Sequence, residues 1–238
     1  MKKILENSSI KIRRSRERGH AKHGWLESYH TFSFAGYQDP NYMGFRVLRV
    51  INEDRVEPGM GFGAHPHDNM EIFSYVIEGA LTHQDSMGHK FTIGAGDVQK
   101  ITAGTRIVHS EFNASTKEIV HFLQIWILPI QRGLEPSYQE YSGLKNKQSV
   151  TLIGSPEGGE NVIKFHQDVY IYKGHLKQNE TFTHELKPTR GVWFQVIQGK
   201  LNVNNEPLST GDGAAIENVS QIKIFPEQEC EFLLMDFA

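Results

Sequence analysis

Three histidines and two glutamates lie in a pattern that suits the binding of a divalent metal ion. His65 and His67 are two positions apart, and so are His109 and Glu111, so each pair can share one face of a β-strand. Glu71 lies an even number of positions beyond His67 and can join the first pair if no bulge intervenes. If the two strands face each other, the imidazoles converge with one or two carboxylates. Such a set suits Fe(II), Mn, Ni, Cu or Zn.

Short strands and tight turns must position these side chains. Turn residues recur at Ser86-Met87-Gly88, Gly94-Ala95-Gly96-Asp97 and Ala103-Gly104-Thr105. We find no long amphipathic helix in the sequence. Strands punctuated by glycine and aspartate every few residues predict an antiparallel sandwich or barrel.

An internal repeat predicts a second barrel of the same kind. The string IFSYVIEGAL at Ile72–Leu81 resembles VWFQVIQGKL at Val192–Leu201, which sets Gly79 on Gly199 at an offset of 120 residues. Further along, Gly96-Asp97 aligns with Gly211-Asp212 at an offset of 115 residues. Two copies of one supersecondary unit are what a duplicated barrel would contain.

The second copy lacks the candidate metal ligands. At these offsets the five candidates fall on other residues: His65 on Glu185, His67 on Lys187, Glu71 on Gly191, His109 on Ile224 and Glu111 on Pro226. His184 lies one position before Glu185, and no second candidate metal ligand is grouped with it. We therefore expect one metal ion, in the first barrel, and a second barrel that packs or covers.

Several longer motifs carry a family resemblance. They are His65-Pro66-His67-Asp68-Asn69-Met70-Glu71, His83-Gln84-Asp85-Ser86-Met87-Gly88, His109-Ser110-Glu111, Arg18-Gly19-His20 and Tyr29-His30-Thr31-Phe32-Ser33-Phe34-Ala35. On these strings the sequence resembles the pirin family. The resemblance implies an all-β fold of two tandem cupin barrels (double-stranded β-helix, jelly-roll) with few short helices. A polar, Gly- and Pro-containing stretch separates the halves, so we predict a metal-binding domain at 1–135, a linker at 136–149 and a ligand-free domain at 150–238.

The resemblance is closest to a bacterial pirin-like branch described as quercetin 2,3-dioxygenases. It implies a metal-dependent dioxygenase that cleaves a flavonol-type, enolic aromatic substrate with O₂ and releases carbon monoxide. It implies that His65, His67, His109 and Glu111 bind one divalent metal, most often Fe(II), with Mn, Ni, Cu, Co or Zn as alternatives. Glu111 or Glu71 would be the catalytic base, and Glu71 could instead orient a ligating imidazole.

Two other functions remain open at this point. Pirins also include nuclear cofactor-like members, which implies an iron-binding, redox-sensing regulatory protein. Cupins host many chemistries, and fold does not fix function, so a non-redox enzyme such as an isomerase is the other alternative.

Composition narrows the class of partner. The 238 residues carry a formal net charge of −3, which gives no general attraction to nucleic acid or membranes. The single cysteine, Cys230, suits a reducing compartment. No apolar segment is long enough for a signal or a membrane span. We predict a cytoplasmic monomer that binds a small planar aromatic molecule and O₂, without direct nucleic-acid contact.

The basic residues before position 19 favour an edge strand over a nucleic-acid arm.

The remaining histidines and aromatics have ordinary interpretations. His83 could hydrogen-bond a metal ligand. The others are expected to be surface or structural residues: His20, His23, His30, His89, His121, His166, His175 and His184. Residues 19–45 are rich in aromatic side chains, which favours packing of an ordered segment over the lining of a pocket entrance.

Overall fold

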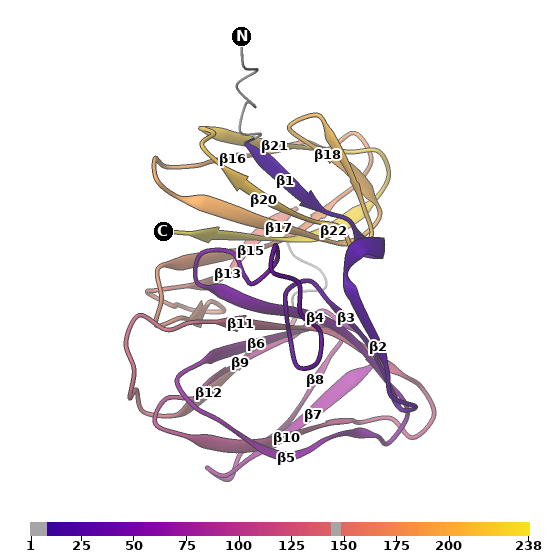
Figure 1. Ribbon diagram of the computed structural model, residues 1–238, viewed down its shortest axis with the longest axis vertical. Coiled ribbons are helices and arrows are strands. Elements are labelled where there is room, and N and C mark those ends of the chain that lie inside the picture. Colours follow the sequence, from indigo (N-terminus) through magenta and orange to yellow (C-terminus); the bar gives the residue numbers. More distant parts are fainter. Residues whose placement is uncertain (1–8, 144–148) are drawn as a thin grey trace. The chain divides into compact units, whose positions relative to one another are not determined.

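Strands dominate the computed structural model, which describes residues 9–143 and 149–238 (Figure 1). Within these residues the single helix is a 3₁₀ turn, η1 (Ser15–Glu17). The described residues group into two compact units, one of 18–143 and 152–170, and one of 9–17, 149–151 and 171–238. We call them the first and the second barrel. The predicted all-β, two-barrel fold is confirmed.

The first barrel consists of two sheets. Its larger sheet has the order β12-β9-β6-β11-β4-β3-β2, and its smaller sheet the order β5-β10-β7-β8. The larger sheet contains β2 (Gly19–Lys22), β3 (Leu26–His30), β4 (Leu48–Val56), β6 (Glu71–Glu78), β9 (Val98–Thr102), β11 (Val120–Ile127) and β12 (Ser137–Tyr141). The smaller contains β5 (Gly61–His67), β7 (Ala80–Asp85), β8 (Lys90–Gly94) and β10 (Ile107–Asn113). Glu111 of β10 hydrogen-bonds side chains of β9 and β11, so the two sheets face each other.

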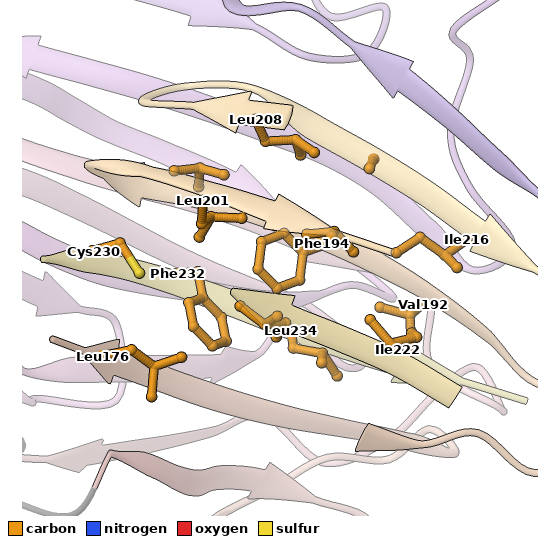
Figure 2. Packing of buried hydrophobic residues seen from close by; sticks show 14 of the residues in the cluster. Leu176, Val192, Phe194, Leu201, Leu208, Ile216, Ile222, Cys230, Phe232 and Leu234 are labelled. Carbon is orange, nitrogen blue, oxygen red and sulfur yellow. The ribbon is translucent and has the colours of Figure 1, made fainter. Parts of the chain in front are cut away.

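The second barrel repeats this plan around an apolar core. Its smaller sheet has the order β16-β21-β18-β19, and its larger sheet contains β1-β20-β17-β22-β15. The strands are β1 (Ile10–Arg13), β15 (Val169–Leu176), β16 (Phe182–Glu185), β17 (Gly191–Gln198), β18 (Lys200–Val203), β19 (Glu206–Ser209), β20 (Gly213–Glu217), β21 (Gln221–Pro226) and β22 (Cys230–Phe237). Phe194, Leu234 and Phe232 point into one cluster between them (Figure 2).

Strand pairing in the two barrels corrects the predicted alignment of the repeat. In the first barrel His109 of β10 pairs with His65 of β5, and in the second Ile222 of β21 pairs with His184 of β16. Leu81 pairs with Asn113 and its counterpart Leu201 pairs with Pro226, so His109 lies at the position of Ile222. The counterpart of His65 is therefore His184, and not Glu185. The counterpart of His109 is Ile222, and not Ile224. Loops of unequal length separate corresponding strands, so one offset cannot hold from strand to strand.

The ends of the units differ from the predicted domain boundaries. Strand β1 pairs with β20, which places residues 10–13 in the second barrel, as its edge strand. The first eight residues of the predicted basic stretch lie outside the described residues. Strand β12 lies in the predicted linker and pairs with β9. Strand β13 (Val150–Ser155) pairs in parallel with β14 (Ile163–Lys164). In residues 9–143 and 149–238, no helix combines the length and apolar character that crossing a bilayer requires.

Candidate metal centre and substrate cavity

The structure brings three of the predicted ligands together on two neighbouring strands. His65 and His67 project from β5, and His109 projects from β10 directly opposite His65. The ring centroids are 4.5 Å apart for His65 and His109, 4.8 Å for His65 and His67, and 5.0 Å for His67 and His109. One nitrogen of each ring lies within 4.8 Å of the others. This spacing fits a single cation between the three rings.

A hydrogen bond to the backbone fixes the tautomer of His65. The Nδ1 atom of His65 lies 2.7 Å from the carbonyl oxygen of Gly63, which can only accept, so this nitrogen donates. Its Nε2 atom then keeps a free lone pair. Such outer hydrogen bonds are how proteins orient imidazole ligands.

A buried chain of side chains orients His109. The Nε2 atom of His83 donates to Asp85 at 3.0 Å, which leaves Nδ1 of His83 to accept from Nδ1 of His109 at 3.4 Å. Asp85 also lies 3.0 Å from Nδ1 of His89. The Nε2 atom of His109 is left as an acceptor, and it is buried without a hydrogen-bond partner. A metal ion would satisfy this atom, so the residues present fit the predicted cofactor.

Burial keeps His67 and His109 in their metal-binding form. Burial and, to a smaller extent, the neighbouring His65 together lower the pKa of His67 to about 4. Burial also lowers the pKa of His109 to about 2, with His65 and His67 adding to the effect. Because both rings are neutral near pH 7, their lone pairs are available to a cation.

Glu111 lies beside this cluster with its carboxylate held in place. Its oxygens accept hydrogen bonds from Nε2 of Gln99 at 2.9 Å and from Nε2 of Gln124 at 2.7 Å. A carboxylate oxygen of Glu111 lies within 4.8 Å of ligand atoms of His109 and His83. Burial raises the pKa of Glu111 to about 7, against the hydrogen bond from Gln124, which lowers it. A carboxylate has further lone pairs, so Glu111 can still bind a metal or take up a proton.

Glu71, the other predicted carboxylate, has different partners. The first strand ends at His67, and the chain turns at Asn69, whose φ of 48° is left-handed. Glu71 then begins β6 in the larger sheet. Its carboxylate accepts from Nζ of Lys100 at 2.9 Å and from the backbone N–H of His166 at 3.1 Å. The strand-parity argument that joined Glu71 to the histidines does not apply across this turn.

A cavity of about 320 Å³ opens beside the histidines. That volume lies at the lower end of the range for small-molecule sites. His65, His67 and Glu111 line part of it, and Trp126 packs edge-on against His67 with ring centroids 4.9 Å apart. Phe34 and Ala35 line it too. The segment 19–45 therefore does contribute a pocket wall, although Phe32 is buried in the core as the favoured interpretation predicted.

The cavity also contains polar side chains that we did not predict to line it, among them His30, which we expected to be a surface or structural residue. They are Ser28, His30, Asn52, Asp54 and Gln124. The available signal was polar residues at alternate positions of otherwise apolar strands, as in Leu48, Val50, Asn52, Asp54 and Val56 of β4. Residues at alternate positions share one face, so this pattern placed two polar groups on a core-facing surface.

Comparison with known proteins agrees with the fold and the motifs. The family model for pirin matches residues 11–127, and the model for a quercetinase C-terminal cupin domain matches residues 152–237. A protein of Escherichia coli K12 named quercetin 2,3-dioxygenase is 47% identical over 229 residues, which cover 95% of this chain and 98% of that protein. Its counterpart in E. coli O157:H7 is 46% identical over the same shares of both chains. The crystal structure of the bacterial pirin YhhW from E. coli in complex with nickel(II) superimposes with a TM-score of 0.92 and 46% identity, covering 96% of this chain and 98% of that one.

Proposed function

The chain belongs to the pirin family of cupin proteins, and we propose that it is a metal-dependent dioxygenase acting on a flavonol-type substrate. The proposed reaction is cleavage of an enolic aromatic ring with O₂ and release of carbon monoxide. The names of the relatives at 46–47% identity support this substrate class. The proposal rests above all on one observation: three imidazoles converge, and two of them, those of His65 and His67, line one cavity together with the buried carboxyl group of Glu111.

His65, His67 and His109 would hold one divalent metal, with Glu111 as a further ligand or as the base. Bound there, the metal would supply Lewis acidity toward the enolic oxygen of the substrate. We retain Fe(II) as the expected metal; the nickel(II) in the E. coli structure supports a divalent transition metal.

Glu111 is the better placed of the two predicted bases. Gln99 and Gln124 hold its oxygens at the cavity, where it can accept the proton of the substrate hydroxyl. Glu71 is engaged with Lys100, and it does not line this cavity. The apolar walls formed by Phe34, Phe62 and Trp126 would bind the flat rings and keep water from the reacting atoms.

Turnover under two atmospheres tests the function. Protein loaded separately with Fe(II), Ni(II) or Mn(II) is mixed with quercetin under air and under argon, and the flavonol absorbance and headspace carbon monoxide are followed. We expect loss of absorbance with carbon monoxide under air alone, and none above the no-protein blank with His67→Ala. Loss under both gases would indicate isomerisation, and metal binding without any turnover would favour the regulatory protein.

Substitution of the proposed base provides a second test. Glu111→Gln keeps the size of the side chain and its hydrogen-bonding capacity, but it cannot take up a proton. We expect kcat to fall by roughly 10²- to 10⁴-fold, the usual contribution of a general base. Unchanged kinetics would instead move the role to Glu71, which Glu71→Gln would then reveal.

A further inference from the structure

A row of polar side chains crosses the larger sheet of the first barrel beneath the cavity. Strand register places His30 beside Asn52, Asn52 beside Gln124, Gln124 beside Ser74, and Ser74 beside Gln99. Gln99 and Gln124 hold Glu111 and so belong to the site described above. The other end of the row, with the adjoining pair Ser28 and Asp54, has no part in that chemistry.

Hydrogen bonds within this end of the row leave part of it available. The Nδ1 atom of His30 lies 2.9 Å from Oδ1 of Asn52, and Ser28 Oγ donates to Oδ1 of Asp54. Within the described residues, this bond from Ser28 is the one side-chain hydrogen bond that Asp54 makes. Its second oxygen, Oδ2, therefore remains an acceptor, and Asp54 is among the residues that line the cavity.

Burying the carboxyl group of Asp54 at this place costs free energy. It is 3% exposed, and the cavity around it is lined by apolar side chains such as Leu26, Phe62 and Phe34. Burial raises the pKa of Asp54 to about 7, against the hydrogen bond from Ser28, which lowers it. Among residues 9–143 and 149–238, this carboxyl group has one hydroxyl partner and no cation, although buried polar groups are normally satisfied. A ligand hydroxyl in the cavity would supply the missing partner.

We propose that Asp54, held by Ser28, accepts a hydrogen bond from a substrate hydroxyl other than the metal-bound one, so that the site selects flavonols with additional ring hydroxyls. This inference rests on the proposed function. A site built to bind a hydroxyl rejects the analogue that lacks it, because the buried acceptor is left unpaired. His30 and Asn52 form the neighbouring polar wall and would assist a second hydroxyl.

The experiment compares two flavonols that differ in their ring hydroxyls. We measure kcat/KM for quercetin and for 3-hydroxyflavone, with wild-type protein, Asp54→Leu and the milder Asp54→Asn. We expect the wild type to prefer quercetin by at least about tenfold, and Asp54→Leu to reduce that ratio by about tenfold. Glu53→Gln is the matched control, because Glu53 lies on the same strand but faces the other side of the sheet, and we expect it to leave the ratio unchanged.

Two results would overturn the inference. One is equal kcat/KM for both flavonols in the wild type, and the other is a ratio that survives in Asp54→Leu and Asp54→Asn while both rates fall. The latter would show that Asp54 only supports the structure.

A binding measurement separates failure of the proposed function from failure of the inference about Asp54. If metal-loaded wild type turns over neither flavonol, the proposed function fails. Binding of both flavonols is then measured by quenching of tryptophan fluorescence, since Trp126 lines the cavity. A Kd ratio that favours quercetin in the wild type and falls in Asp54→Leu would still support the hydroxyl site, and equal Kd values would refute it.

Discussion

The two barrels share one strand order, but polar side chains inside the first barrel correspond to apolar side chains inside the second. Leu81 pairs with Asn113 in the first barrel and Leu201 pairs with Pro226 in the second, so Glu111 corresponds to Ile224. Register in the larger sheets gives the other counterparts: Ser74 corresponds to Phe194, Gln99 to Ala214 and Gln124 to Leu234. All four counterparts belong to the apolar cluster of the second barrel. Two of them, Phe194 and Leu234, are labelled in Figure 2.

This difference separates what the fold needs from what the site needs. The second barrel shows that this topology packs well with an apolar interior. The polar group around Glu111 is therefore not required by the strand arrangement, and burying it has a cost in free energy. We infer that the first barrel retains it for chemistry, as fold and function are separable. Substitutions at corresponding positions can test this inference in both barrels.

The largest expected effect is loss of the metal from one barrel. His65→Ala removes one of three convergent imidazoles, and His184→Ala removes its counterpart, which bonds Asp236 at 2.9 Å instead. We expect His65→Ala to reduce bound metal from about one per chain to below about 0.1, because a cation with too few protein ligands exchanges into solvent. Inductively coupled plasma mass spectrometry of both variants measures the metal directly.

His184→Ala is the matched control for this change. It should keep the metal and lose only stability, since Asp236 loses a hydrogen-bond partner that Arg190 replaces in part. Full metal content in His65→Ala, or metal loss in His184→Ala, would contradict the assignment of the site to the first barrel.

The second prediction introduces a carboxyl group into the apolar barrel. Ile224→Glu repeats the residue of the first barrel at the corresponding position, but without glutamine partners. We expect the free energy of unfolding to fall by about 3 kcal/mol or more, because the buried carboxyl has nothing to bond. Urea denaturation measures this, with Ile224→Val as the size control at about 1 kcal/mol. A loss no larger than the control's would mean that the second barrel tolerates a polar centre.

The third prediction concerns the residue behind His109. His83 pairs with Glu111, and its counterpart Val203 pairs with Ile224, so His83→Val substitutes the residue of the second barrel. Loss of the acceptor for Nδ1 of His109 frees that ring to rotate. We expect the Kd for Ni(II) or Fe(II), measured by competition with a chelator, to rise by about 10- to 100-fold at unchanged stoichiometry. An unchanged Kd would deny the orienting role, and complete loss of metal would make His83 itself a ligand.

Spacing within one strand was enough to predict part of the site. His65 and His67, and likewise His109 and Glu111, share a face as predicted, because parity holds along β5 and along β10. Glu71 was grouped with them by the same rule, but the left-handed turn at Asn69 carries it into another sheet. The motif alone does not reveal that change of sheet.

Contacts between residues of different strands could not be predicted from the sequence. Asp54 and Ser28 meet only because β3 pairs with β4, and Gln124 and Gln99 meet Glu111 only because two sheets face each other. Each is an unremarkable polar residue in its own segment. The repeat was visible in sequence, but its register was one to two residues off, because unequal loops shift each strand separately.

The smallest expected effects should be equal in the two barrels. Gly79 and Gly199 have φ angles of 77° and 94°, and each directly follows a strand of the larger sheet and precedes a strand of the smaller sheet. A Cβ atom at Gly79 would lie 2.6 Å from the carbonyl oxygen of Ile119, and one at Gly199 would lie 2.4 Å from that of Glu229. We expect Gly79→Ala and Gly199→Ala each to lower the free energy of unfolding by about 1 to 3 kcal/mol. Gly36→Ala, where a Cβ has open space, is the control for urea denaturation. If one barrel tolerated its alanine and the other did not, the shared fold would not require this turn. The glycine would then have to be explained by the needs of one barrel alone.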